Sequence, residues 1–284
     1  MSQARFGRRL MTVTGIDELG VYRVLRAIDA EHPGGETTAW APEPGQFAML
    51  AAVERWGGGD DERPHLPRAF SIARLSNGES QFLLEDVGPG TRRLCELRAG
   101  DGLWALGPLG QGFIIGGPAL DQRRALLVGG GVGIAPLAIL QDTLAAQAGE
   151  RDAVVLLGFR DAERAAGAAL LEGARIATDD GSVGHHGLVT ELLAEEIERY
   201  PHAVVYACGP AGMLEGVRAL CAATATPAQL ALEAGMACGY GACFGCVVPR
   251  RGGGYLRVCV DGPVIDAAEL EHVDAHAGGV GWTR

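Results

Sequence analysis

The feature that most constrains this chain is a set of four cysteines between positions 238 and 259. Their spacing is Cys238-x4-Cys243-x2-Cys246-x12-Cys259. A 2Fe–2S cluster needs four thiolates, two on each iron, and C-x4-C-x2-C followed by a distant fourth cysteine is the plant-type arrangement. Glycines at 239, 241 and 245 allow a loop to wrap closely around such a cluster. The spacing therefore favours a 2Fe–2S cluster held by these four cysteines.

A structural zinc site is the main alternative for the same cysteines. Zinc sites with four cysteines usually contain two C-x2-C pairs, whereas this segment contains one, which ends at Cys246. The gap of 12 residues before Cys259 is too short for the helix and strands of a complete ferredoxin fold. We therefore expect a compact module attached to something larger. Of the cysteines outside the pattern, Cys95 and Cys221 are expected to be buried structural residues.

Two larger regions precede the cysteine-rich segment. Up to about residue 120, short apolar runs at 21–27, 47–53, 70–75 and 82–87 predict strands of a barrel or sandwich. From residue 123, apolar strands at 125–128, 154–159 and 203–207 alternate with helices at 135–146, 188–199 and 213–222, which predicts a parallel sheet covered on both faces. The expected fold is a β-barrel domain over residues 1–118, an α/β parallel-sheet domain over 119–228, and a small cluster module with a tail over 229–284.

Charge and composition exclude several classes of function. The 284 residues carry a net charge of −11, which argues against a nucleic-acid-binding surface. All 24 basic residues are arginines, so a Schiff-base lysine, a pyridoxal phosphate site and a Walker-A lysine are excluded. The longest uncharged stretches, 102–120 and 125–141, are interrupted by glycine and proline, and the basic N-terminus lacks an apolar h-region. We expect a cytoplasmic protein that neither spans a membrane nor binds nucleic acid.

Two segments of the first region are suited to binding phosphate. Arg68 stands before an apolar strand, and arginine binds phosphate with two parallel hydrogen bonds. Gly88-Pro89-Gly90-Thr91 opens a short helix, and a helix N-terminus with glycine amides also binds phosphate. Two such elements fit a pyrophosphate better than a single phosphate. With the flavin that the resemblance described below implies, we therefore expect FAD rather than FMN.

A second glycine-rich turn opens the α/β region. Gly129-Gly130-Gly131-Val132-Gly133 follows a strand and precedes a helix, but Ile134 takes the place of the third glycine of G-x-G-x-x-G. A Rossmann dehydrogenase is therefore disfavoured. The family resemblance described next implies that the segment from Thr178 contacts the ribose of the nucleotide. Asp179 and Asp180 stand there, whereas a 2′-phosphate would need arginines, so NAD(H) is expected in preference to NADP(H). Arg160, after the second strand, is the residue that would favour NADP(H), since its side chain is long enough to reach a phosphate.

The order of these segments resembles that of the ferredoxin–NADP reductase superfamily. Arg68-Ala69-Phe70-Ser71 is similar to its R-x-Y-S flavin motif, and Gly129 to Leu137 is similar to its G-G-G-x-G-x-x-P-L turn. The family more often has proline at the position of Ala69 and an aliphatic residue at that of Phe70. The resemblance implies FAD-binding residues Arg68, Ala69, Phe70, Ser71, Leu84, Glu85, Gly90 and Thr91, and NAD-binding residues Gly130, Gly131, Gly133, Thr178, Asp179, Cys208 and Gly209.

Within that superfamily, residues 8 to 272 resemble the electron-transfer subunit of type B, NAD-dependent dihydroorotate dehydrogenases. The match is best from Met236 through Cys246 and from Val258 to Val264. It implies a separate FMN-containing catalytic subunit, in a heterotetramer, that oxidises dihydroorotate in pyrimidine biosynthesis. Electrons would pass through the 2Fe–2S cluster and FAD to NAD⁺. No catalytic acid–base pair is expected in this chain, and Tyr240 and Phe244 are candidates for the face that meets the partner.

Three other functions stay open at this point. A flavin/iron–sulfur subunit of a hydrogenase, sulfite reductase or ferredoxin–NADP transhydrogenase would use the same electron-transfer logic with another partner. A self-sufficient oxygenase reductase would need a full ferredoxin domain, which the short cysteine module does not provide. A structural zinc module with an empty flavin fold would have no redox activity.

Overall fold

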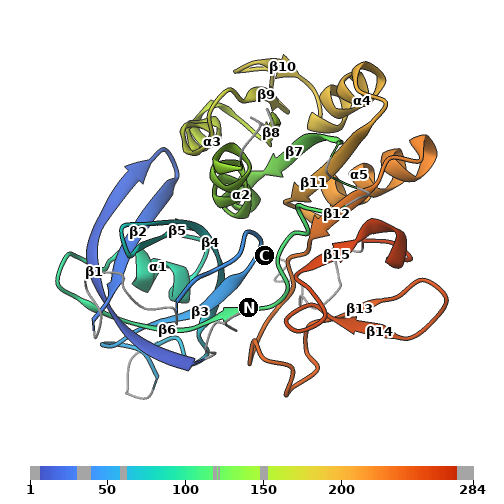
Figure 1. The fold of residues 1–284 in the computed structure, drawn as a ribbon. Coiled ribbons are helices and arrows are strands. Elements are labelled where there is room, and N and C mark those ends of the chain that lie inside the picture. Colours follow the sequence, from blue (N-terminus) through green and yellow to red (C-terminus); the bar gives the residue numbers. More distant parts are fainter. Residues whose placement is uncertain are drawn as a thin grey trace.

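Six strands from the first part of the chain form a closed antiparallel barrel (Figure 1). They are β1 (Gly7–Leu19), β2 (Tyr22–Asp29), β3 (Phe47–Ala52), β4 (Arg68–Ser76), β5 (Glu79–Glu85) and β6 (Gly102–Leu109), in the order β1-β2-β5-β4-β3-β6. Apolar side chains such as Met11, Leu50 and Phe82 fill the interior and are at most 1% exposed. The short helix α1 (Pro89–Cys95) follows β5 and contacts β5 and β3. Closure leaves the barrel without an unpaired strand edge.

The computed structural model describes residues 7–30, 40–57, 63–117, 120, 122–147 and 153–273. The tail expected after residue 273 lies outside these ranges. None of the helices in them combines the length and the apolar character needed to cross a lipid bilayer.

A seven-stranded sheet forms the second part, in the order β10-β9-β8-β7-β11-β12-β15. Its strands are β7 (Arg124–Gly130), β8 (Val154–Phe159), β9 (Arg175–Thr178), β10 (His185–His186), β11 (Ala203–Cys208), β12 (Ala228–Ala231) and β15 (Val264–Asp266). The pairs from β10 to β12 are parallel, and β15 is antiparallel to β12. The expected parallel sheet is thus present, with one antiparallel strand at its edge.

Helices cover both faces of this sheet. The 3-10 helix η1 (Gly131–Ile134) leads into α2 (Ala135–Ala146) on one face, whereas α4 (Val189–Arg199) and α5 (Ala211–Thr224) pack together on the other. On the α2 side, the short helices α3 (Ala162–Ala165) and η2 (Ala166–Leu170) follow β8. Neighbouring side chains of the central strand β7 point to opposite faces of the sheet. Leu127 packs on the α2 side and Leu126 on the α4 side. This division explains why the strands are apolar throughout.

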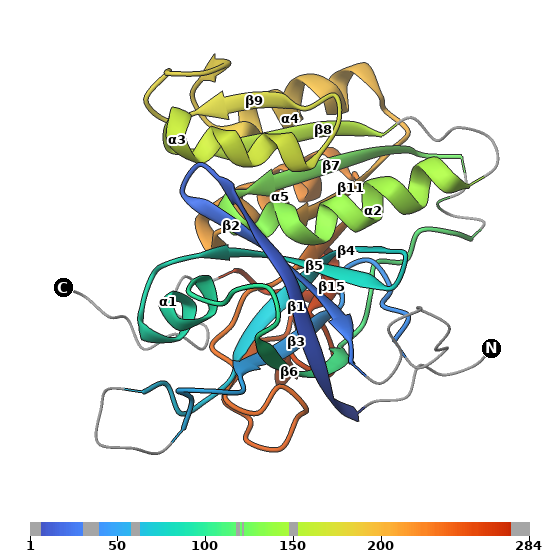
Figure 2. The same cartoon turned by 90° about the vertical axis from the view of Figure 1, so that its left-hand side faces the viewer.

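Helix α2 joins the sheet to the barrel. It runs between the two parts (Figure 2) and contacts barrel strand β4. Asp142 on α2 accepts two hydrogen bonds from Arg74 on β4, at 2.7 and 3.1 Å. This paired contact is one of the links that hold α2 against β4.

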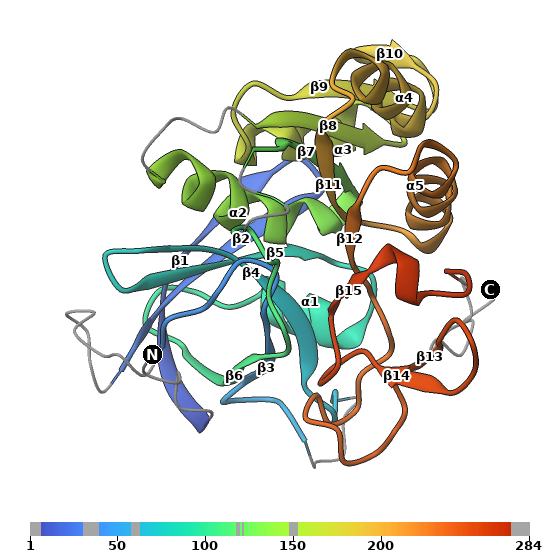
Figure 3. The same cartoon turned by 45° about the vertical axis from the view of Figure 1, so that its right-hand side comes forward.

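The cysteine segment lies between two strands of the sheet rather than beyond it. It leaves the sheet after β12, forms the small hairpin of β13 (Val247–Pro249) and β14 (Tyr255–Arg257), and returns as β15, followed by η3 (Ala267–Glu269) (Figure 3). Strand β12 spans the limit that we expected between residues 228 and 229, and its residues 229–231 pair with β11 on one side and with β15 on the other. The division into three domains remains a proposal, but this sheet is shared by the second and third regions.

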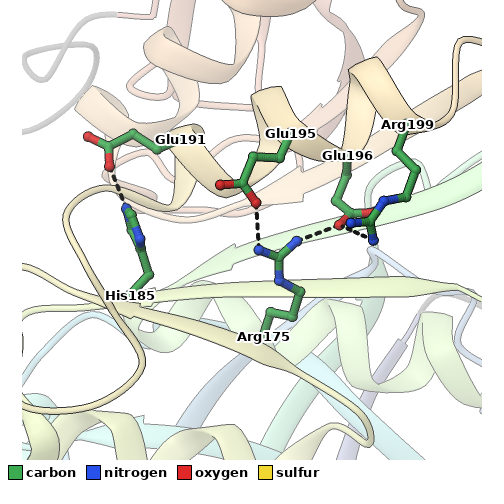
Figure 4. Close-up of polar contacts among 6 residues, drawn as sticks. All are labelled: Arg175, His185, Glu191, Glu195, Glu196 and Arg199. Atoms are coloured by element: carbon green, nitrogen blue, oxygen red, sulfur yellow. Dashed lines mark hydrogen bonds and ion pairs between the residues drawn. The ribbon is translucent and has the colours of Figure 1, made fainter.

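A buried carboxylate fastens α4 to the edge of the sheet (Figure 4). Glu196 is 1% exposed, and it pairs with Arg175 from β9 and with Arg199 at 3.1 Å. A buried charge is tolerated when it is paired in this way. His185 on β10 lies 2.5 Å from the carboxylate of Glu191 on α4. This contact also links α4 to the edge of the sheet.

Candidate functional site

The expected flavin residues meet where β4 passes the start of α1. All four residues from Arg68 to Ser71 are half-buried on β4, in contrast to Ile72, which is inside the barrel. A methyl group added at Gly90 would lie 2.5 Å from Arg68 Nε, so the guanidinium rests directly on this bare backbone. The two segments expected to bind phosphate are about twenty residues apart in the chain and are in contact in the structure.

Two further side chains, Thr91 and Trp56, lie beside Arg68 and Gly90. Thr91 accepts hydrogen bonds from the backbone N–H groups of Val87 and Gly88, at 2.9 and 3.0 Å, which fixes the turn before α1. The ring of Trp56 lies 6.0 Å from the Arg68 guanidinium, and its buried Nε1 has no hydrogen-bond partner among the described residues. An arginine, a glycine cradle and an unsatisfied donor fit the pyrophosphate of FAD.

The other two expected flavin residues lie elsewhere. Leu84 is fully buried in the barrel interior, so only its backbone is available to a ligand. Glu85, one residue later and facing the other way, reaches the cleft described next.

A cleft of about 590 Å³ opens at the carboxyl ends of the parallel strands. The cleft lies at the ends of β7 and β11, where the strand order of the sheet reverses direction. Open α/β sheets bind their ligands at such a switch point. Of the expected NAD residues, Gly130, Gly131 and Asp179 line it. The barrel contributes Tyr22, Glu85 and Val87 to the opposite wall.

The remaining expected NAD residues lie behind the cleft wall. A methyl group at Gly133 would be 2.5 Å from the Cα and N atoms of Gly209, so the turns after β7 and β11 touch through their backbones. Cys208 is 3% exposed, and burial, followed by the charge of Glu233, raises the pKa of its thiol well above the ordinary value. The Thr178 hydroxyl is occupied by the backbone of Val183, at 2.9 and 3.1 Å. These residues shape the site without facing into it.

Two charged residues of the cleft were missed by the sequence reasoning. Arg164 on α3 donates to Asp161 at 2.8 Å and lies 3.4 Å from Glu85, so it links the nucleotide side to the barrel. Glu233 lies two residues after β12. The residue as a whole is exposed, but the atoms packed around its carboxyl group raise its pKa through burial. The position of Glu233 at the end of a parallel strand was a usable signal, whereas nothing in the sequence marks Arg164.

The four cysteines form two pairs of different exposure. The Sγ atoms of Cys246 and Cys259 are 3.2 Å apart and buried, and burial, followed by Cys246, raises the pKa of Cys259 to about 12. Burial alone would raise the pKa of Cys238, but hydrogen bonds from nearby backbone and from the Cys243 side chain lower it to about 6. Cys243 is exposed.

The four thiols supply the donors that a two-iron cluster takes. Two thiol pairs match the two thiolates that each iron of a 2Fe–2S cluster takes. Left-handed backbone at Gly239 and Gly241, with φ of 79° and 85°, shapes the loop between the first two cysteines. The donor set therefore fits the cluster.

The cysteine loop rests on the barrel, close to the flavin motif. A methyl group at Gly239 would lie 2.6 Å from the Cγ atom of Met49 on β3. Met49 in turn pairs with Ala69, the second residue of the flavin motif on β4. Only one strand therefore separates the cysteine loop from the strand that carries Arg68 to Ser71.

Comparison with known proteins agrees with this geometry. Residues 233–271 match the model of the iron-sulfur cluster binding domain of dihydroorotate dehydrogenase B, and residues 127–219 match that of the oxidoreductase NAD-binding domain. A solved structure of an NADH-dependent reduced ferredoxin-NADP oxidoreductase, studied for flavin-based electron bifurcation, has the same fold, with a TM-score of 0.73 and 23% identity. That alignment covers 94% of this chain and 91% of the other.

Two curated relatives align over most of their length. The dihydroorotate dehydrogenase B (NAD(+)), electron transfer subunit, of Caldanaerobacter subterraneus subsp. tengcongensis is 37% identical over 236 residues, which are 81% of this chain and 87% of the relative. The subunit of the same name from Geobacillus thermodenitrificans is 38% identical over 247 residues, covering 83% and 90%. This chain belongs to the family of dihydroorotate dehydrogenase B electron transfer subunits.

Proposed function

We propose that this chain carries electrons from an FMN-containing dihydroorotate dehydrogenase subunit, through a 2Fe–2S cluster and FAD, to NAD⁺ in pyrimidine biosynthesis. The observation that supports this most is the packing of the cysteine loop on β3, beside the strand of the flavin motif. The nucleotide cleft meets the same barrel through β2 and β5. One barrel therefore contacts both the cysteine loop and the cleft.

The residues of this chain act by holding and orienting the groups. Arg68 and the turn at Gly90 would hold the pyrophosphate of FAD, with Phe70 and Ser71 further along the same strand. Cys238, Cys243, Cys246 and Cys259 would ligate the cluster. FAD, when bound, exchanges a hydride with nicotinamide and single electrons with an iron–sulfur cluster. The protein's part is positioning and tuning rather than acid–base catalysis.

The cleft is suited to NAD(H). Asp179 lines it at the end of β9, and its backbone N–H donates to Phe159 O at 3.0 Å, so the carboxylate is held at the cleft edge. A carboxylate there accepts hydrogen bonds from ribose hydroxyls and repels a 2′-phosphate. Arg160 lines the same cleft and is the group that would favour NADP(H). We propose that Asp179 outweighs it.

The partner subunit is proposed to dock over the exposed cysteine pair. Around Cys243, the side chains of Tyr240 and Phe244 are 53% and 61% exposed, and Tyr255 on the neighbouring hairpin is 71% exposed. Aromatic residues supply much of the binding energy of protein interfaces. The relatives' name, electron transfer subunit, implies a catalytic partner; the heterotetramer is our proposal.

A cytoplasmic location is also proposed. The seven cysteines, all among the described residues, form no disulfide bond, as is usual for proteins of a reducing compartment.

The experiment that tests the function combines this chain with an FMN-containing dihydroorotate dehydrogenase subunit from the same source. We expect the purified chain alone to pass electrons from NADH to a dye without oxidising dihydroorotate. The complex should reduce NAD⁺ with dihydroorotate. Dihydroorotate oxidation by the isolated chain would contradict the proposal. Failure of the partner to bind, or to gain NAD⁺ linkage, would favour the hydrogenase-type alternative.

A further inference from the structure

Tyr22 is held rigidly where the barrel meets the nucleotide domain. It begins β2, directly after the hairpin turn at Gly20, and it is 0% exposed. A methyl group at Gly20 would lie 2.2 Å from Glu163 O, so the hairpin presses against α3. One at Gly167 would lie 2.8 Å from the Tyr22 ring and 3.1 Å from Ile134. The ring is therefore clamped between the barrel and the nucleotide domain.

The hydroxyl of this clamped ring lacks a hydrogen bond. Among the described residues, no partner is present for Tyr22 Oη, although it is buried. The other fully buried tyrosine, Tyr206 on β11, donates to Ile114 O at 3.2 Å. Leaving a buried hydroxyl unsatisfied is unfavourable, so such a group calls for a specific explanation.

The surroundings of Tyr22 point to a ligand in the cleft. Tyr22 lines the cleft together with Gly130 and Gly131, the turn at the start of η1. Burial, followed by the charge of Glu85, raises the pKa of Tyr22 to about 12, so the phenol keeps its proton and can donate. Arg160 and Arg164 line the same cleft. Arg164 is paired with Asp161 and Glu85, and the carboxylates of Glu85, Asp179 and Glu233 also line the cleft. The protonated phenol, the Arg160 guanidinium and the glycine amides are groups there that can receive an anion.

The position of the cleft identifies the anion. Most of the cleft wall comes from the ends of the parallel strands, and the residues expected to hold the flavin pyrophosphate, Arg68 and Gly90, do not line it. We propose that the Tyr22 hydroxyl donates a hydrogen bond to the pyrophosphate of the bound nicotinamide dinucleotide, so that the barrel supplies one ligand to the nucleotide site. This inference rests on the proposed function, because it takes NAD(H) as the occupant.

Tyr22→Phe tests the proposal, with Tyr206→Phe as the matched control. Both changes remove one buried hydroxyl and keep the ring. In the purified protein with its cofactors, titration with NADH and with ADP-ribose, which keeps the pyrophosphate and lacks nicotinamide, should give dissociation constants about two- to tenfold higher for Tyr22→Phe. Tyr206→Phe should bind both ligands as the wild type does, and it should melt about 2–4 °C lower because it loses a satisfied bond.

The possible results distinguish a failure of this inference from a failure of the proposed function. If the wild type binds neither NADH nor ADP-ribose, the proposed function fails. If the wild type binds both and Tyr22→Phe binds them equally well, the inference is wrong and the function stands. Loss of FAD from Tyr22→Phe without a change in ADP-ribose affinity would assign the hydroxyl to the flavin and overturn the inference. A loss confined to NADH would assign it to the nicotinamide, with the same consequence.

Discussion

Replacing Gly133 by alanine should damage both stability and nucleotide binding. The added methyl carbon would lie 2.5 Å from Gly209 Cα and 2.6 Å from the carbonyl carbon of Cys208. Carbon atoms prefer a separation of about 3.5–4.0 Å, so the overlap is roughly 1 Å. Both opposing atoms belong to the backbone, and pairing of Cys208 with Gly129 holds that backbone in place. The methyl group cannot be accommodated by rotating a side chain.

The loss of stability in Gly133→Ala can be estimated because this contact is rigid. Extra methyl groups in a tightly packed region cost about 1–3 kcal/mol. A protein of this size loses about 2–4 °C of melting temperature for each kcal/mol, so Gly133→Ala should melt roughly 2–12 °C lower. Because the same contact sets the spacing of the turns after β7 and β11, the affinity for NADH should fall as well.

Thermal melting followed by circular dichroism, together with an NADH titration, measures both effects. Gly212→Ala is the control for melting, because nothing lies within 4 Å of its added methyl group. It lies near the start of α5, where alanine is preferred to glycine by about 0.5–1 kcal/mol. Gly212→Ala should therefore melt at the wild-type temperature or slightly above it. A Gly133→Ala protein with wild-type melting and wild-type NADH affinity would refute the steric argument.

Three further results are expected. Cys246→Ser should lose the iron and acid-labile sulfide, about two of each per chain in the wild type, while Cys95→Ser retains them; a full complement in Cys246→Ser would exclude it as a ligand. Arg68→Ala should weaken FAD retention by about 1.5–3 kcal/mol, measured by flavin fluorescence after dialysis, and unchanged retention would remove Arg68 from the flavin site. The carboxylate of Glu215 accepts from Arg218 and from Val273 N at 2.8 Å, which lowers its pKa. Its stabilisation should be complete above about pH 4.3, the usual glutamate pKa, and disappear as pH falls through the lowered value. The difference in melting temperature between wild type and Glu215→Gln should therefore shrink in acid, and a constant difference would contradict this.

Local features of the fold could be read from the sequence because they depend on nearby residues. The helix expected at 135–146 and the strand expected at 154–159 coincide with α2 and β8, since each is a single apolar segment. The long strand β1 escaped notice because its residues are mostly polar or intermediate in exposure, and a bulge between Val13 and Gly15 interrupts its alternation. Strand β15 is only three residues long, and it was missed for that reason.

The sequence by itself determined the chemistry that the chain can offer. Four cysteines at a fixed spacing, an arginine before a strand and glycines before helices specify thiolate, guanidinium and amide groups at particular turns, because turn geometry is set within a few residues. Those local signals, together with the family resemblance, pointed to a cluster, a flavin and a dinucleotide.

Only the tertiary structure decided how these groups meet. Arg68 covers Gly90, Gly239 rests on Met49, and Tyr22 is buried in the wall of a cleft built mainly by residues more than a hundred positions later. Each of these contacts depends on how the barrel, the sheet and the cysteine loop pack, and packing is a property of all the surrounding side chains at once. The local hydrophobic pattern of a segment does not specify which distant segment it will contact, since the same strand or turn can form against many different neighbours.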